Sequence, residues 1–204
     1  MKHRLKVWGD FACFTRPEIK TERVSYDVIT PSAARGFFEA ILWNPQIKWS
    51  IELIQVLNPI KWINVRRNEI GSRVLDSREL YIEEERVQRS SIFLKNVAYV
   101  LQASLQSFSS DLHLEKKFNA IFKRRASKGQ CFAQPYLGCR EFSSYFQLLE
   151  PDEQYPVLEE TRDLGWMLYD MKYSQEEISP QFFYAAMKNG EILVPSKDSL
   201  EIYG

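Results

Sequence analysis

The spacing of hydrophobic and polar residues along the chain predicts an alternation of strands and helices. Residues 4–11 alternate polar and apolar side chains, which is typical of a strand with one buried face carrying Leu5 and Val7. A long loop is predicted over residues 15–30. Pro31 then begins a helix that runs to about Trp43, because apolar residues recur at helical spacing and Thr30 is a suitable N-cap.

The second half of the chain predicts more strands than helices. Residues 71–91 are charged and irregular, which predicts a loop with a short helical turn. Asn189-Gly190 is the dipeptide expected at the turn of a β-hairpin. The predicted elements, in chain order, are strands at 47–57, 60–70 and 97–108, a helix at about 114–128, strands at 143–149 and 166–173, and a hairpin over 183–194.

The order strand, helix, strand, strand, helix, strand is typical of the split βαβ pattern of a ferredoxin-like (RRM-like) domain, so we predict an α+β fold. On that plan, residues 60–70 form an inserted β-hairpin arm. We expect residues 1–128 to form the ferredoxin-like domain, with its last strand at 142–149. Residues 129–204 are then a small C-terminal β-sheet domain.

Charge is distributed unevenly, although the 27 basic and 27 acidic residues cancel. From Leu148 onward, 12 residues are acidic and 4 are basic, so residues 1–147 hold 23 basic and 15 acidic residues. A basic body with an acidic tail is the asymmetry expected of a protein that binds nucleic acid or phosphate.

Several other functional classes receive little support. The cysteines (Cys13, Cys131 and Cys139) are odd in number and lack Cys-x-x-Cys spacing, which favours a reduced, cytoplasmic protein. No apolar run is long enough for a membrane span. His3 and His113 are the two histidines, and no carboxylate cluster has the spacing of metal ligands, so we expect neither a metal nor another cofactor.

The segment 114–129 is the strongest functional signal. Between Lys116 and Lys128 it carries six basic residues and no acidic one. At helical spacing Phe118, Ile121 and Phe122 share a buried flank, and the cations spread over the rest. Such a helix suits a polyanion such as RNA, although a solvated basic face that only aids solubility is an equally simple interpretation.

RNA cleavage without a metal is compatible with this composition. Attack by a ribose 2′-OH on its own phosphodiester needs a base, an acid for the leaving 5′-oxygen, and a cation near the developing negative charge. A lysine on the basic helix could provide the cation. DNA lacks the 2′-OH and would not react in this way.

Eight short motifs occur in an order that resembles one protein family, the CRISPR-associated RAMP proteins of family five, subtype I-C (the Dvulg subtype). They are residues 7–18 (VWGDFACFTRPE), 22–28 (ERVSYDV), 31–36 (PSAARG), 65–69 (VRRNE), 122–126 (FKRRA), 129–132 (GQCF), 135–142 (PYLGCREF) and 162–168 (RDLGWML). The resemblance spans roughly residues 4–195. It implies a ferredoxin-like domain followed by a small β-domain.

The resemblance also implies a role in CRISPR antiviral defence. Members bind the repeat RNA, cut the precursor at the base of the repeat hairpin, and hold the crRNA 5′ handle in the interference complex. The implied partners are the family-seven backbone subunits and the family-eight large subunit.

The catalytic positions implied by the resemblance are only partly filled. Members that cut RNA carry a Tyr or similar group before the Trp that ends the first helix, and a Lys followed by His or Tyr in the second helix. Here these positions read Leu42, Lys117 and Phe118. Lys117 remains as the charge stabiliser, whereas Leu42 and Phe118 cannot exchange protons. His113, one helical turn before Lys117, or Lys116 could substitute, or the protein could bind RNA without cutting it well.

Arginine and lysine residues from distant segments are the candidates for RNA binding, because arginine grips phosphate bidentately or stacks on a base. A surface salt bridge is the alternative for each of them. Trp8, Trp49 and Trp62 are candidates for stacking on unpaired bases, although an aromatic residue in a strand is more often part of the core. The RNA-binding candidates are Arg23, Arg66, Arg67, Lys116, Lys123, Arg124, Arg125 and Arg140, and we expect Arg66, Lys117 and Arg124 to converge on one ribose-phosphate track. An RNA-binding regulator unrelated to CRISPR would explain the charge but not the ordered motifs.

Overall fold

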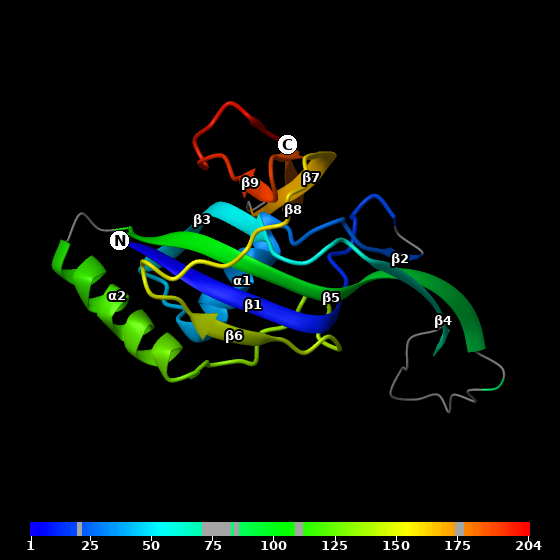
Figure 1. The fold of residues 1–204 in the computed structure, drawn as a ribbon, viewed down its shortest axis with the longest axis horizontal. Helices are drawn as coiled ribbons and strands as arrows, with labels where there is room; N and C mark the ends of the chain where they lie inside the picture. The colour runs from blue at the N-terminus through cyan, green and yellow to red at the C-terminus, as the bar shows by residue number, and fades with distance from the viewer. Residues whose placement is uncertain (20–21, 71–82, 84–85, 109–111, 174–177) are drawn as a thin grey trace.

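The computed structural model describes residues 1–19, 22–70, 83, 86–108, 112–173 and 178–204. Within these ranges the protein is a mixed α/β structure with two helices and two largely antiparallel sheets. The larger sheet has the strand order β6-β1-β5-β3-β9, and β2 and β4 also pair with β5. The smaller sheet has the order β10-β8-β7. Figure 1 shows the larger sheet running along the long axis of the molecule, with α2 at one end and β4 at the other.

The alternation at the N-terminus produces the predicted strand, which is slightly longer than expected. In β1 (Lys2–Ala12) the odd-numbered positions from His3 to Gly9 are buried, and the even-numbered positions from Lys2 to Trp8 face the other side. β1 lies between β5 (Arg86–Ser107) and β6 (Tyr145–Leu148). The buried face of β1 therefore points towards the helices.

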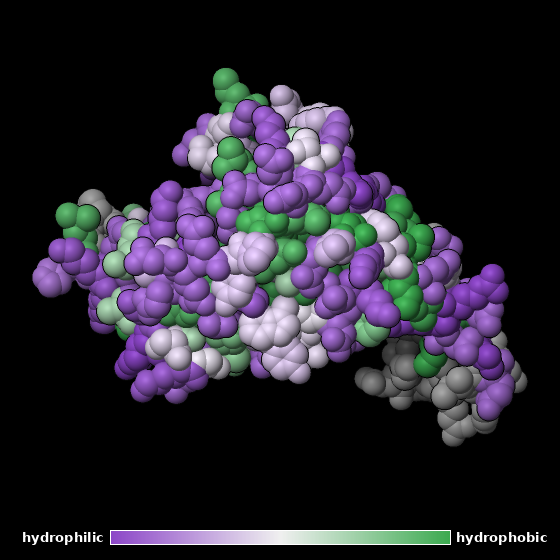
Figure 2. Space-filling view, in the orientation of Figure 1, coloured by the Kyte–Doolittle hydropathy of each residue, from purple (hydrophilic) through white to green (hydrophobic). Residues whose placement is uncertain are grey.

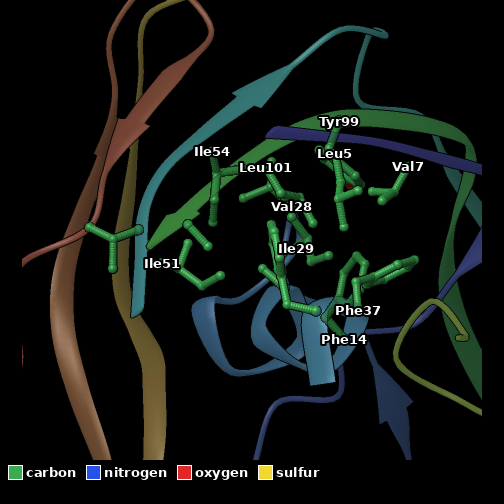
Figure 3. Packing of buried hydrophobic residues seen from close by; sticks show 14 of the residues in the cluster. Leu5, Val7, Phe14, Val28, Ile29, Phe37, Ile51, Ile54, Tyr99 and Leu101 are labelled. Carbon is green, nitrogen blue, oxygen red and sulfur yellow. The ribbon is translucent and has the colours of Figure 1, made fainter. Parts of the chain in front are cut away.

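The first helix begins where the sequence predicts it. α1 (Pro31–Ile41) has Thr30 as N-cap, whose side chain accepts a hydrogen bond from the Ala33 amide at 3.3 Å. Its buried stripe packs on the inner face of the sheet, between β1 and β3 (Ile47–Val56). Figure 3 shows Phe37 of α1 below Leu5, Val7 and Leu101 of the sheet.

The predicted loop at 71–91 is partly wrong, because its last residues belong to a strand. β5 begins at Arg86, and its first part pairs with β4 (Trp62–Ile70), with Trp62 opposite Leu94 and Ile70 opposite Arg86. The other half of β5 pairs with β1 and β3. One strand thus serves both the sheet and the arm. Residues 71–82 and 84–85, and the predicted helical turn on them, lie outside the described residues.

A local irregularity marks the point where the arm leaves the main sheet. Asn96 of β5 has φ +54°, a left-handed conformation that asparagine tolerates better than most residues. Near this point β3 ends. The chain that follows β3 pairs with β5 again from Lys61, whose carbonyl accepts a hydrogen bond from the Lys95 amide. The predicted loop at 15–30 also contains a short strand, β2 (Arg23–Val24), which pairs with the arm half of β5.

The C-terminal hairpin has its predicted turn, closed by antiparallel pairing of Lys188 with Glu191, but its two strands then join different sheets. Asn189 and Gly190 both have positive φ values, +48° and +74°, as a two-residue hairpin turn of type I′ requires. The first strand, β8 (Ile178–Met187), pairs with β7 (Arg162–Tyr173) and β10 (Ile202–Tyr203). The second, β9 (Glu191–Leu193), joins β3 instead, because Ile192 buries its side chain in the main core.

The outer face of the main sheet is crossed by the segment that follows β6. Figure 1 shows this yellow segment running over β1 and β5 on the side away from α1. Arg4 of β1 donates to the carbonyl of Glu153 at 2.8 Å, and the amide of Leu158 donates to Val56 of β3 at 2.8 Å. Among the described residues, no helix is long and apolar enough to cross a membrane.

Candidate nucleic-acid interface

The basic segment predicted as a helix forms α2 (Leu112–Ser127), which has one buried and one charged face. Phe118, Phe122 and Ala126 are buried. The ring centroid of Phe122 lies 4.5 Å from that of Trp49 and 5.6 Å from that of Phe38. Gly129 follows the helix at φ +65°, the left-handed conformation common just after a helix C-terminus. Core packing therefore fixes which side of α2 faces solvent.

The solvent-facing side of α2 carries most of the candidate cations of this helix. Lys116, Lys117, Lys123 and Arg124 are all exposed. Lys123 lies 3.9 Å from a Glu150 oxygen, but both side chains are more than half exposed, so this ion pair is weak. No acidic side chain in the described ranges pairs with the other three. These charges are held at the surface without compensation, as a polyanion site requires.

The surroundings of Lys117 show which side chains near it could transfer protons. α2 begins at Leu112, early enough to include His113, so His113 and Lys117 are four residues apart on one helix face. Phe118 is 7% exposed and Leu42 is 4% exposed, and both belong to the core. The two positions where the resemblance implies proton-transfer groups therefore hold buried hydrocarbon. The His113 imidazole and the Lys117 ammonium group are exposed on the same helix as Phe118.

Arg125 is not exposed as a phosphate-binding side chain would be, because it makes a structural contact. Its side chain is half-buried and donates to the carbonyl of Ile41 at 3.1 Å. The indole of Trp49 donates to the next carbonyl, that of Leu42, at 2.9 Å. These bonds satisfy carbonyl groups at the end of α1, which have no partner within the helix. Arg125 joins the two helices.

Sequence reasoning assigned no role to His3, which the structure places under α2. The Asn119 side chain donates to the carbonyl of Glu115 at 2.9 Å, and this fixes its amide orientation. Its Oδ1 atom must then accept the 2.6 Å hydrogen bond from His3 Nε2. Burial lowers the pKa of His3, the bond to Asn119 opposes this, and the nearby charges of the N-terminus and Lys123 lower the pKa further. Alternation along β1 could have shown that His3 points inward, but not what it contacts.

The candidate arginines on the arm differ in their surroundings. Arg66 is exposed, with no ion pair among the described residues. Arg67 is half-buried and pairs with Glu141. Its guanidinium carbon lies 4.7 Å from the ring centroid of Phe93 and 5.7 Å from that of Phe142. Arg23 pairs with the same carboxylate at 3.1 Å. Two of the predicted RNA-binding residues thus hold Glu141 between them and connect the arm to the loop before β6.

Arg140 lies apart from these groups. Its side chain is exposed and lines a cavity of about 570 Å³ along α1, together with Thr15, Glu39 and Tyr136. The neighbouring Glu141 pairs with Arg23 and Arg67, so the loop directs successive charges to different surfaces.

The structure does not bring Arg66 together with Lys117 and Arg124. β4 and α2 lie at opposite ends of the long axis in Figure 1. The reason is topological: β4 pairs with the first half of β5, whereas α2 follows its far end. Arg66 is opposite Ser90, and the 17 residues from there to Ser107 span roughly 55 Å in an extended strand. The predicted single track is therefore wrong, and α2 forms a cationic surface separate from that of Arg66.

The described residues include no group of three or more His, Cys, Asp or Glu side chains placed to hold a metal ion.

Comparison with known proteins gives one consistent family. The model of the family Cas_Cas5d, described as "CRISPR-associated protein (Cas_Cas5)", matches residues 4–195. The chain is 48% identical to the CRISPR pre-crRNA endoribonuclease Cas5d of Mannheimia succiniciproducens, over 94% of each chain. It is 38% identical to the protein of the same name from Thermus thermophilus, over 98% of this chain and 94% of that one.

Solved structures share the fold. A functionally uncharacterized protein, SMU1763c from Streptococcus mutans, matches with a TM-score of 0.73 and 21% identity, over 100% of this chain and 97% of that one. A crystal structure of a CRISPR-associated protein matches with the same TM-score and coverage, at 22% identity. At these identities the likeness concerns the fold alone.

Proposed function

Because this chain belongs to the Cas5d family of CRISPR-associated proteins, we propose that it binds CRISPR repeat RNA, cleaves the crRNA precursor without a metal, and retains the crRNA 5′ handle in the interference complex. The names of the relatives support the activity, since both are pre-crRNA endoribonucleases. The observation in this chain that carries the proposal is the exposed, largely unpaired cationic face of α2.

In this proposal the substrate supplies its own nucleophile. The ribose 2′-OH attacks the adjacent phosphorus, the bond to the 5′-oxygen breaks, and the products are a 2′,3′-cyclic phosphate and a 5′-OH. Lys117 stabilises the negative charge that builds up on the phosphoryl oxygens. His113, on the same helix face, accepts or donates a proton at the reacting oxygens. Lys116, Lys123 and Arg124 hold the flanking phosphates.

A second function within the same complex is supported by two positions. Leu42 and Phe118 are buried where proton-transfer groups are expected, which favours a structural subunit that binds crRNA and cuts it slowly or not at all. The two functions share the RNA and the α2 surface. They differ in the fate of the substrate.

Incubation of the purified protein with repeat RNA in EDTA separates these two functions. Cleavage that persists with EDTA, gives a cyclic phosphate end, and stops when the 2′-OH at the scissile position is removed supports the nuclease. Tight, salt-sensitive binding of RNA that stays intact supports the structural subunit. RNA that does not bind at all contradicts both.

The role of Lys117 has its own test. Lys117→Ala is expected to lower the single-turnover cleavage rate about 100-fold or more, as removal of a group that stabilises a transition-state charge does. Affinity should fall only by the loss of one phosphate contact. Lys188→Ala, an exposed lysine in the turn after β8, is the matched control and should leave both quantities unchanged. Equal cleavage rates for the two variants would remove Lys117 from the mechanism.

We further propose that the main sheet is a ferredoxin-like domain extended by an arm. The strand order β6-β1-β5-β3, with α1 after β1 and α2 after β5, supports this. The division at residue 129 into this domain and a C-terminal β-unit is supported by the separate sheet β10-β8-β7. The family-seven and family-eight subunits of the type I-C interference complex are the proposed protein partners. Co-purification with each of them tests this assignment.

A further inference from the structure

The outer face of the main sheet carries an aromatic cluster that the proposed function does not use. Trp8 of β1 lies opposite Tyr145 of β6, and their rings stack at 23° with centroids 5.7 Å apart. The Tyr145 side chain is 64% exposed. Figure 2 shows pale, weakly polar side chains gathered over β1 and β6 near the middle of this face. The stack is thus open to solvent.

A cavity of about 410 Å³ lies on the other side of Trp8. Its floor is formed by Val97 and Ala98 of β5, and Ala98 is the neighbour of Trp8 on the strand side away from Tyr145. Tyr145 therefore stacks on the indole of Trp8, and the same indole also lines the cavity. The volume falls in the range of small-ligand sites. A planar group that enters would continue the stack.

The walls of this cavity provide the polar groups that a nucleotide needs. The Lys6 ammonium lies over the Tyr155 ring, 3.8 Å from its centroid, and over the Trp8 ring, 5.4 Å from its centroid. Asn58 donates one amide hydrogen to the Asn96 carbonyl at 2.9 Å, which fixes its position. Within the described residues, the Asn58 Oδ1 atom and the Asn96 side chain have no hydrogen-bond partner. The cavity lining contains a cation and two amides and no carboxylate.

We propose that this cavity is a stacking site for one unpaired nucleobase of the bound RNA. The base stacks on the part of the Trp8 ring that lines the cavity, Lys6 moves from the Trp8 ring to the phosphate of this nucleotide, and the Asn58 and Asn96 amides contact the edge of the base. The inference rests on the proposed function, because it places a single-stranded part of the same RNA. Aromatic faces, amides and a cation together suit a nucleotide better than a protein segment, whose apolar side chains leave those amides unpaired.

The distance from α2 is compatible with one continuous RNA. β6 connects the two sites: Tyr145 begins it beside Trp8, and Leu148 ends it near the Lys123–Glu150 pair at α2. Three residues of strand span about 10 Å. We therefore place the single-stranded flank of a hairpin held on α2 along β6, in the direction of Trp8 and the cavity.

The test compares repeat RNA with its natural single-stranded flank and the same RNA with abasic sites in that flank. Phosphate charge is identical in the two, so a difference in affinity reports base contacts. We expect the abasic RNA to bind the unmodified protein about 5- to 150-fold more weakly. Trp8→Ala should weaken the intact RNA by a similar factor and remove the difference between the RNAs, whereas Trp8→Phe should retain most of it. Trp166→Ala, a 51% exposed tryptophan on β7, is the control and should change neither affinity.

The outcomes separate this inference from the function on which it rests. Intact and abasic RNA that bind the unmodified protein equally tightly overturn the stacking site and leave the proposed function in place. Failure of both RNAs to bind contradicts the proposed function itself. The RNA-side comparison needs no protein variant, so poor folding of Trp8→Ala does not weaken the test. A difference that persists in a folded Trp8→Ala variant places the base contact elsewhere and also overturns the proposal.

Discussion

The salt dependence of RNA binding can be calculated from the surface of α2. Lys116, Lys117 and Arg124 are exposed and have no ion pair among the described residues, so each is free to displace a counterion from RNA. Lys123 already lies near Glu150 and is left unchanged in this design. Each phosphate contact contributes about −0.7 to −0.9 to the slope of log K against log salt. The triple change Lys116→Gln, Lys117→Gln, Arg124→Gln should therefore make the slope shallower by about 2.1 to 2.7.

This change in slope predicts a large and measurable difference in affinity. Between about 50 and 200 mM salt, the unmodified protein should lose roughly 20- to 40-fold more affinity than the triple variant. Fluorescence anisotropy with labelled repeat RNA at four or five salt concentrations measures both slopes. Thermal unfolding checks that the variant remains folded, which is expected because the three side chains lie outside the core.

A second triple variant with the same change in charge provides the control. Lys172, Lys188 and Lys197 are exposed residues of the acidic C-terminal part, and their replacement by glutamine lowers the net charge equally. If RNA contacts α2 directly, this variant keeps the slope of the unmodified protein. Equal slopes for the two triple variants would show that net charge, and not the α2 surface, determines binding, and the reasoning from unpaired cations would be refuted.

Three further predictions concern stability and pH. Arg125→Gln removes the hydrogen bond to the Ile41 carbonyl, so denaturant unfolding should show a loss of about 1–2 kcal/mol while the salt slope of RNA binding stays unchanged; a normal unfolding midpoint with a changed slope would contradict this. The pKa of His3 is lowered by burial, so the unfolded chain binds a proton first, and the free energy of unfolding should fall as pH drops below about 6.5; an equal fall in His3→Gln would assign the effect to other groups. Gly138→Ala places a Cβ atom 2.0 Å from the Cys13 carbonyl oxygen at φ +84°, so it should lower the free energy of unfolding by more than about 2 kcal/mol. Gly36→Ala, with open space on α1, should instead raise the free energy of unfolding by roughly 0.5–1 kcal/mol. Similar unfolding midpoints for both variants would refute this.

The local elements were largely predictable because their signals are local. The alternation of β1, the cap and proline at the start of α1, the buried stripe of α2 and the Asn189-Gly190 turn each depend on residues within a few positions of one another. Burial of Leu42 and Phe118 also followed from their apolar side chains at helical spacing. The ordered motifs identified the family, which the comparisons confirm.

Pairing between distant segments was not predictable from these signals. The pattern at 183–194 is compatible with a simple hairpin, and the preference of β9 for the edge of β3 depends on core space that exists only in the folded chain. The residues 86–91 look charged and irregular alone, but they form a strand because β4 pairs with them. The length of β5 then separates Arg66 from α2.

The family, both helices of the described residues, most strands and the cationic face of α2 follow from the sequence, because side-chain type and short-range spacing control all of these. The tertiary structure alone decided which cations are free: it turns Arg125 to the end of α1, places Glu141 between Arg23 and Arg67, and leaves Lys116, Lys117 and Arg124 in solvent. It also opens the cavity beside Trp8. The physical reason is that charge belongs to a residue, whereas its compensation depends on neighbours that are brought close only when the chain folds.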